Sequence, residues 1–365
     1  MQIIQDRRAL HRIPELALCL PKTMDYLRAS LEGLGCTLFS PVESSLCAYF
    51  DFGAEKTIAF RADCDALPIR EGADHQYVST HPGNMHACGH DGHMAILLEL
   101  ARRLSAKEKL CKNVLLIFQP GEETPGGALS ICKTGVLETY GVEAIFGLHL
   151  WPGLQKGEMF CREEEMMSHA SEITVEIFGK SAHLAKSEDG IDAMAAAVEL
   201  HRLVAEAEAS LPAQVYRLMK FGKMYSGSVR NAVSDHSRLE GSLRAFQDDV
   251  FDCLKDRLYA IGKEVEAKFG CRVQIHMTEG YPAVMNSPAL CQKIWEHLPV
   301  NRLDKPSMTA EDFSWYQRYV PGVFFFLGLG DVPALHSDVF DFDDTVLKKG
   351  ADFFENLVEN VACYL

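Results

Sequence analysis

The stretch HACGHDGH, residues 86–93, gathers thiol, imidazole and carboxylate groups into neighbouring positions of the chain. Cys88 and His90 are separated by one glycine, and Asp91 and His93 come shortly after them. Thiolate and imidazole groups bind divalent transition metals in proteins. Because a metal site needs three or more convergent ligands, this stretch predicts one part of a site whose other ligands lie elsewhere.

Three further segments offer ligands at or near the ends of apolar runs. Glu122 and Glu123 follow NVLLIFQP, His149 lies in AIFGLHL, and His336 comes after GVFFFLGLG. Each residue alone has an ordinary structural explanation, such as a helix cap or a hydrogen-bonded histidine. Together the candidates exceed what one tetrahedral ion takes, so we predict two divalent ions that share a ligand. The predicted ligands are Cys88, His90, Glu123, His149 and His336.

The identity of the metal is left open by this ligand set. Imidazole and thiolate suit zinc, whereas mixed imidazole and carboxylate sites also hold manganese, cobalt or nickel.

Glu122 directly precedes the predicted ligand Glu123. Since successive side chains of extended backbone point to opposite sides, we expect that the two do not ligate the same ion. Hydrolysis assisted by metal ions needs a carboxylate that takes a proton from water and delivers it to the leaving nitrogen. Glu122 is therefore the predicted general base.

The elements that must position these residues alternate between strand and helix patterns. Apolar runs typical of buried strands begin at Thr57, Asn113 and Ala144, and HMAILLELARRL has helical spacing between the first two. This alternation predicts an α/β fold, with a mostly parallel sheet covered by helices on both faces. Such sheets place ligands at the carboxyl ends of their strands, where the candidate residues lie.

The pattern changes after Met167. From Glu172 to Gly280 the expected order is β-α-β-β-α-β, which is the ferredoxin-like unit, complete in itself. We therefore predict a catalytic metal-binding domain in two parts, residues 1–167 and 281–365, and an inserted ferredoxin-like lid or dimerisation domain at 168–280.

Length and composition fit a globular protein of more than one domain. The chain has 365 residues and a net charge of −15, without a basic run, which argues against nucleic acid as a partner. The N-terminal residues lack an export signal and no apolar stretch is long enough for a membrane span, so we expect a cytoplasmic protein without membrane contact. Most of the 12 cysteines are then reduced packing residues.

Eight segments of the chain resemble, in order, motifs of the metal-dependent N-acyl-amino-acid amidohydrolases. These include hippurate hydrolase, indoleacetyl-amino-acid hydrolases and N-acetyldiaminopimelate deacetylase, within the aminoacylase and carboxypeptidase metallopeptidase clan. The resemblance covers nearly the whole chain and assigns the same five ligands and the same base. The segments are HRIPELAL, FRADCDALPI, GNMHACGHDGHMA, FQPGEETPGGA, GLHLWP, GKSAH, TAEDFS and LHSDVFDFDD.

The resemblance also implies roles for residues that spacing alone does not single out. Asp63 and Asp65 would orient a ligand imidazole through its second nitrogen. His183 would reach an active site, either its own or that of the other subunit in a dimer, and stabilise the oxyanion. Asn231 and Arg244 match positions that hold the substrate carboxylate, although Arg244 is equally well explained as a surface strand residue. His86 and His93 are expected to support the site or the fold.

The predicted function is hydrolysis of the amide bond between a small acyl group and a free amino acid. The chain departs from the family at Gly121, where alanine is usual, and near His183, where Lys186, Glu188 and Asp189 add charges. These charges leave the preferred acyl group open. The alternatives are N-acetyldiaminopimelate deacetylase specifically, a di- or carboxypeptidase with the same metal centre, and a binding relative that has lost catalysis. We expect a homodimer, because the inserted domain has a sheet edge that could pair with another subunit.

Overall fold

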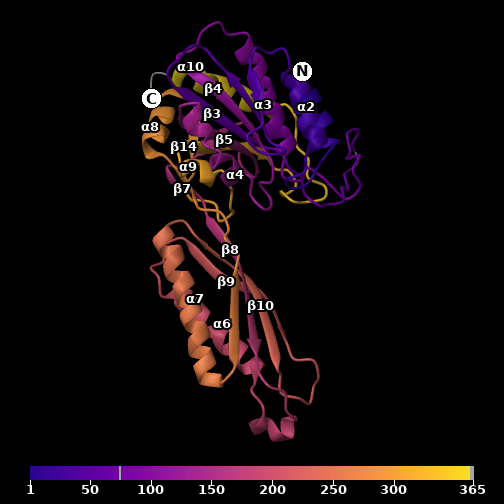
Figure 1. The fold of residues 1–365 in the computed structure, drawn as a ribbon, viewed down its shortest axis with the longest axis vertical. Helices are drawn as coiled ribbons and strands as arrows, with labels where there is room; N and C mark the ends of the chain where they lie inside the picture. The colour runs from indigo at the N-terminus through magenta and orange to yellow at the C-terminus, as the bar shows by residue number, and fades with distance from the viewer. Residues whose placement is uncertain (74, 362–365) are drawn as a thin grey trace. The chain divides into compact units, whose positions relative to one another are not determined.

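The computed structural model describes residues 1–73 and 75–361, which form two compact units (Figure 1). Unit 1 comprises residues 1–166, 285–306 and the chain from Asp312 onward, and unit 2 comprises residues 167–284 and 307–311. The sequence predicted an inserted domain at residues 168–280. Unit 2 instead ends its main segment at Val284 and also includes residues 307–311. Ser168 Oγ donates a hydrogen bond to the carbonyl of Met308 at 2.8 Å, which explains why that segment belongs to unit 2.

Unit 1 is built on a mixed sheet with a parallel centre. Within the described residues the sheet has eight strands in the order β1-β2-β4-β3-β5-β14-β6-β13. The four central strands, β4, β3, β5 and β14, run parallel, as predicted. The strands are β1 (Thr37–Phe39), β2 (Leu46–Phe50), β3 (Thr57–Asp63), β4 (Asn113–Gln119), β5 (Val142–Pro152), β6 (Met159–Cys161), β13 (Val300–Arg302) and β14 (Gly322–Gly330).

Helices cover both faces of this sheet, because the central strands are apolar on both sides. Phe146 of β5 packs on Phe60 of β3, which packs on Phe354 at a ring distance of 4.8 Å. A side chain at the next residue, Gly147, would meet the ring of Phe313 on the other face. The helices described in this unit are α1 (Gln2–His11), α2 (Pro21–Leu31), α3 (His90–Ser105), α4 (Ala128–Cys132), α5 (Val136–Thr139), α8 (Pro288–His297), α9 (Ser314–Gln317) and α10 (Val346–Val361).

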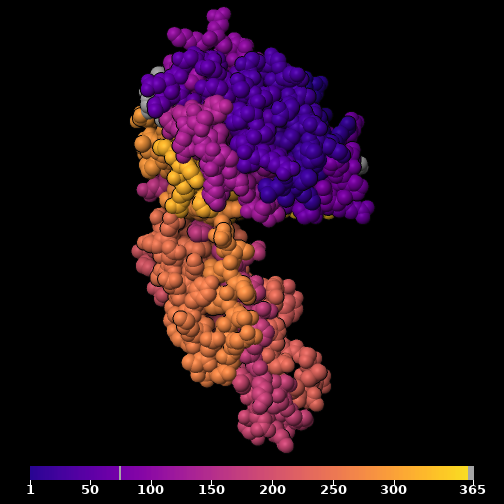
Figure 2. Space-filling view, in the orientation of Figure 1, coloured from indigo at the N-terminus to yellow at the C-terminus, as the bar shows by residue number. Residues whose placement is uncertain are grey.

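Helix α3 is buried on most of its surface. It contacts β3 and β5, and α1, α2 and α10 pack around it. On the face of unit 1 shown in Figure 2, the N-terminal part of the chain, coloured indigo, covers most of the surface. His90, Asp91 and His93 at the start of α3 are buried inside the unit.

Unit 2 has the strand order of the ferredoxin-like fold, as predicted. Over its described residues the sheet order is β11-β8-β10-β9, and every pair is antiparallel. Alternate residues of β8, namely Ile173, Val175 and Ile177, are buried in the same apolar core as residues of the two long helices. The elements are β8 (His169–Phe178), the 3₁₀ helix η1 (Leu184–Asp189), α6 (Ala193–Ala209), β9 (Arg217–Ser226), β10 (His236–Ala245), α7 (Asp248–Phe269) and β11 (Arg272–Met277).

The two connections between the units include short strands that pair with each other, β7 (Glu164–Met167) and β12 (Val284–Asn286). Among the described helices, none combines the length and the apolar character that crossing a membrane requires.

Candidate metal centre

The candidate ligands lie where the parallel strands end and α3 begins. His149 is in β5, paired in register with Phe326 of β14, and Glu123 lies in the loop after β4. His90 is the first residue of α3, after Gly89, which has a φ of +82°. Because only glycine adopts this conformation freely, Gly89 lets the chain turn sharply between Cys88 and His90.

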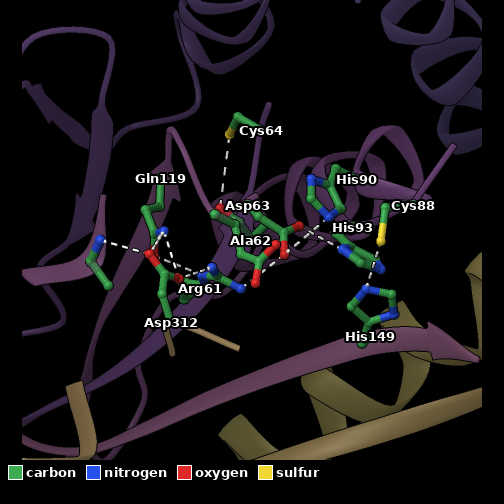
Figure 3. Close-up of polar contacts among 12 residues, drawn as sticks. Arg61, Ala62, Asp63, Cys64, Cys88, His90, His93, Gln119, His149 and Asp312 are labelled. Atoms are coloured by element: carbon green, nitrogen blue, oxygen red, sulfur yellow. Dashed lines mark hydrogen bonds and ion pairs between the residues drawn. The ribbon is translucent and has the colours of Figure 1, made fainter. Parts of the chain in front are cut away.

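Cys88 lies between two groups of candidate ligands. Its Sγ is 3.4 Å from Nε2 of His149 and 3.3 Å from Nε2 of His336, and Figure 3 shows the first contact. Cys88, His90 and His149 have ligand atoms within 4.8 Å of one another, and so do Cys88, Glu123 and His336. The thiol is therefore placed where two ions could share it.

The protonation of the histidines suits a metal. His90 Nδ1 is 2.8 Å from the carbonyl of Asp65, and His149 Nδ1 is 2.7 Å from the carbonyl of Leu150. Each Nδ1 must carry the proton to donate to a carbonyl, so each Nε2 presents a lone pair. Nε2 of His90 is buried without a hydrogen-bond partner among the described residues. Burial also lowers the pKa of both imidazoles, which keeps them neutral.

The Cys88 thiol needs a cation to ionise. Burial raises its pKa well above the usual value, and the neighbouring carboxylates Glu123 and Glu122 raise it further. A cation placed between thiol and carboxylates would reverse this balance, so metal binding should release the thiol proton. The donor set of thiol, neutral imidazole and carboxylate thus fits divalent transition metals.

Glu122 and Glu123 both reach His90, so the alternation of extended backbone does not separate them, and their different roles toward the ions stay a prediction. Gly121 has a φ of +70° and begins a turn in which the alternation of extended backbone does not hold. Carboxylate oxygens of both residues lie within 4.8 Å of each other and of a ring nitrogen of His90. They differ in that Glu123 Oε1 also lies 3.2 Å from Nε2 of His336.

The carboxylate of Asp65 holds this turn. It accepts hydrogen bonds from the backbone N–H groups of Glu122 at 2.8 Å and of Glu123 at 3.1 Å. The second nitrogen of His90 is bound by the backbone carbonyl of Asp65, whereas the nearer carboxylate oxygen is 3.7 Å away. Asp65 therefore orients a candidate ligand as predicted, but through its main chain, and its side chain positions the glutamate pair.

Asp63 orients His93, which is not one of the five candidate ligands, rather than the second nitrogen of a ligand imidazole. Its Oδ1 accepts from Nδ1 of His93 at 2.6 Å, and Nε2 of His93 accepts from the N–H of Leu150 at 2.9 Å. His93 therefore fixes β5 next to His149. This is the supporting role that we expected for His93 from the sequence. Although burial acts in the opposite direction, His90, His93 and Arg61 hold the pKa of Asp63 well below its usual value.

A buried network that the sequence analysis missed fixes the loop carrying the glutamate pair (Figure 3). Arg61 Nη2 donates to Asp312 at 2.7 Å, and Gln119 Nε2 donates to it at 2.8 Å. The N–H groups of Gly127 and Ala128, at the other end of the loop, donate to Oδ2 of Asp312 at 2.9 and 3.0 Å. An arginine inside an apolar buried strand was the signal that could have revealed this network.

We expect Asp312→Asn to lower the free energy of unfolding by about 3 kcal/mol, measured by urea denaturation. The amide keeps the size of the carboxylate but loses its charge, and an amide cannot accept from Arg61, Gln119 and the two N–H groups at once. Asp331→Asn, at an exposed aspartate of the same unit, should change stability by less than about 0.5 kcal/mol. Equal effects of the two substitutions would contradict this role of Asp312.

In unit 2 the three predicted residues do not all come together. His183 and Asn231 are exposed and adjacent, because His183 pairs with Ala232 and the N–H of Leu184 donates to the carbonyl of Asn231 at 3.1 Å. Arg244 lies near the other end of β10 and donates to the carbonyl of Met308. At about 3.3 Å per residue along a strand, Arg244 is more than about 20 Å from the other two. Within one chain, Arg244 therefore cannot act on the same atoms as His183.

Known proteins resemble this chain over most of its length. The model of peptidase family M20/M25/M40 matches residues 59–360. An uncharacterized hydrolase of Staphylococcus aureus strain MRSA252 is 35% identical over 373 residues, which cover 98% of this chain and 97% of that protein.

Solved structures share the fold as well. The Bacillus subtilis YXEP protein, described as a dinuclear metal binding peptidase from the M20 family, is 27% identical with a TM-score of 0.86, over 100% of this chain and 98% of that one. The aminopeptidase PepT from Bacillus cereus, 16% identical with a TM-score of 0.77 over 99% of this chain and 98% of that one, shows the fold alone.

Proposed function

Because the chain belongs to peptidase family M20/M25/M40, we propose that it hydrolyses the amide bond of N-acyl amino acids with the help of two divalent metal ions. The observation that carries the proposal is the position of Cys88 between two groups of candidate ligands in unit 1. The description of the Bacillus subtilis relative as a dinuclear metal binding peptidase supports two ions. The ligands would be Cys88, His90, Glu123, His149 and His336.

The ions, when bound, would lower the pKa of a water molecule and polarise the scissile carbonyl. Zinc fits the thiolate and imidazole groups, and manganese, cobalt or nickel fits the mixed set with Glu123.

Glu122 would move the proton. Its carboxylate takes a proton from the attacking water and gives it to the nitrogen as the C–N bond breaks, which leaves a carboxylic acid and a free amino acid. The backbone N–H of Glu122 donates to Asp65, so the same turn that holds Glu123 also fixes the position of this base.

His183 would supply the oxyanion donor. Its Nδ1 accepts a hydrogen bond from the N–H of Ala185 at 3.1 Å, so the proton of the neutral ring is on Nε2. An exposed Nε2–H of this kind can donate to the oxygen of the scissile carbonyl. Asn231, adjacent to His183, and Arg244, at the other end of β10, would contact the substrate carboxylate. Because these two lie far apart in one chain, a homodimer whose lids serve each other's centres is part of the proposal.

The first test is removal of the metal. We expect thorough chelation to abolish hydrolysis of N-acetyl and N-benzoyl amino acids, and re-addition of zinc or manganese to restore it, because the ions activate the water. Metal content and released amino acid are measured on the same samples. Undiminished hydrolysis by metal-free protein would overturn the metal mechanism.

A substrate panel decides between the candidate activities. N-acyl amino acids, N-acetyldiaminopimelate and dipeptides are compared by kcat/KM with each metal. A preference for N-acetyldiaminopimelate narrows the proposal to a deacetylase of that compound, whereas a preference for dipeptides replaces it with a peptidase. The absence of turnover in fully metal-loaded protein would favour a binding relative.

The role of His183 is tested by mixing variants. We expect His183→Ala to lower turnover by roughly 10²-fold while metal content stays unchanged, as for other lost oxyanion donors. Dissociating and reassociating it with an excess of Glu122→Gln subunits should restore activity, because some dimers then combine an intact Glu122 with an intact His183. No restoration in demonstrably mixed dimers would mean that His183 acts within its own chain or only structurally.

A further inference from the structure

A second cluster of potential metal ligands lies in unit 1, apart from the dinuclear centre. It joins the last residue of α1, His11, to Glu71 and His75 in the segment before the Cys88 motif. Oε1 of Glu71 is 3.0 Å from Nε2 of His11 and 3.0 Å from Nε2 of His75. The three ligand atoms lie within 4.8 Å of one another. Ligands of a tetrahedral zinc ion, with bonds of about 2.1 Å, are about 3.4 Å apart, so the cluster has the dimensions of a metal site.

His11 is already oriented as a metal ligand. Its Nδ1 is 2.8 Å from Oδ2 of Asp91, which is buried and also accepts from Nε of Arg7 at 2.9 Å. A histidine that donates Nδ1–H to a carboxylate presents the lone pair of Nε2, which is the usual arrangement behind a metal-bound imidazole. Here Nε2 of His11 faces Oε1 of Glu71 at 3.0 Å, and although burial acts in the opposite direction, Asp91 and the hydrogen bonds to Asp91 and Glu71 raise the pKa of His11 to about 9. A cation bound at this nitrogen would therefore displace its proton.

Glu71 and His75 are also fixed by contacts that leave one potential ligand atom of each facing the cluster. The second oxygen of Glu71 accepts from the N–H of Ser79 at 2.6 Å, which leaves Oε1 to face the histidines. The ring of His75 stacks on Tyr77 at a centroid distance of 3.8 Å. Both nitrogens of His75 are buried and make no hydrogen bond within the described residues, although Nε2 lies beside Glu71. Nε2 of His75 therefore has a free lone pair beside the carboxylate of Glu71 and the ring of His11. This arrangement suits a cation.

The charge around the cluster favours a cation. The contacts that run from the cluster through Asp91 and Arg7 connect four carboxylates with two guanidinium groups, so negative charge is left over even when His11 is protonated. A divalent ion would balance it. The carboxylates are Glu71, Asp91, Asp341 and Asp344, and the guanidinium groups are Arg7 and Arg8.

We propose that His11, Glu71 and His75 bind a third divalent transition-metal ion, which joins the end of α1 to the segment that leads into the Cys88 motif. Two imidazoles and one carboxylate are a zinc ligand set, with a fourth position for water. The carboxylate that orients His11 belongs to Asp91, the residue after the candidate ligand His90. The third ion would therefore stabilise the start of α3 through His11 and Asp91.

Equilibrium dialysis of the full chain tests the proposal. Chelator-treated wild-type protein, His75→Leu and Glu71→Gln are dialysed against a zinc buffer, and bound zinc per chain is measured by elemental analysis. Each variant should bind one zinc ion fewer than the wild type, because two ligands and a water molecule hold zinc poorly. His236→Leu is the matched control: His236 is exposed, its Nε2 lies 3.5 Å from Oε1 of Glu176, and its substitution should leave the zinc content unchanged.

The difference between wild type and variants, rather than the total, decides the outcome. A dinuclear centre that holds fewer ions than proposed would lower all the totals equally and leave the difference intact. Circular dichroism establishes that the variants are folded, and His75→Asn, which keeps a polar group, replaces His75→Leu if the latter is unfolded. Equal zinc contents in wild type and folded variants would overturn the third site and show His11 to be only a hydrogen-bonded residue between two carboxylates.

Discussion

Glu122→Gln should leave a folded chain that binds its metal ions but hydrolyses N-acyl amino acids at least about 100-fold more slowly. General base catalysis contributes on the order of 10²- to 10⁴-fold, and the amide keeps the shape of the carboxylate while losing its basicity. The loss should fall on kcat, with metal content unchanged. Steady-state kinetics and metal analysis on the same preparation measure both quantities.

The turn that brings both glutamates to the site makes a paired control necessary. Glu123→Gln, whose carboxylate contacts His336, should lower metal occupancy first and activity as a consequence. Glu138→Gln, at an exposed glutamate of the same unit, should change neither. If Glu122→Gln lost metal while Glu123→Gln kept it and lost only turnover, the two roles would have to be exchanged.

Cys88→Ala should lose both ions and lower activity by roughly 10³-fold or more. Cys88 belongs to both groups of candidate ligands, so its removal weakens both positions at once, and the ions supply several kcal/mol of transition-state stabilisation. His149→Ala changes the group of Cys88, His90 and His149 but leaves Cys88, Glu123 and His336 intact. It should therefore retain about one ion and recover part of its activity at high metal concentration.

Cys111→Ala is the control for this series, because Cys111 is an exposed cysteine outside both groups. Its metal content and activity should equal those of the wild type. Retention of two ions by Cys88→Ala would contradict a shared thiolate and would require the ions to be held by histidine and carboxylate alone.

The sequence by itself determined the elements and their order. Buried parallel strands are apolar throughout, as in NVLLIFQ of β4, and the ferredoxin-like unit alternates on one face, as at Ile173, Val175 and Ile177 of β8. These periodicities are local, so they can be read without coordinates. The convergence of Cys88 with distant histidines could also be predicted, because the carboxyl ends of parallel strands meet at one edge of a sheet.

Contacts between distant segments were decided only by the tertiary structure. Glu122 and Glu123 share a side because Gly121 starts a turn, and Asp65 holds this turn with its carboxylate. Arg61 and Asp312 are 251 positions apart in the sequence, yet Nη2 of Arg61 lies 2.7 Å from Oδ1 of Asp312. No local pattern encodes which polar group a buried side chain will reach, since that choice depends on how the strands and loops pack.

The same holds for the cluster proposed as a third site. His11 ends a helix, whereas Glu71 and His75 are themselves outside helices and strands, and none of the three has a spacing that predicts a metal ligand. They meet because α1 packs against α3, which brings His11 to Asp91. The sequence determined which groups could bind a metal, and the packing of helices and loops decided which of them lie close enough to do so.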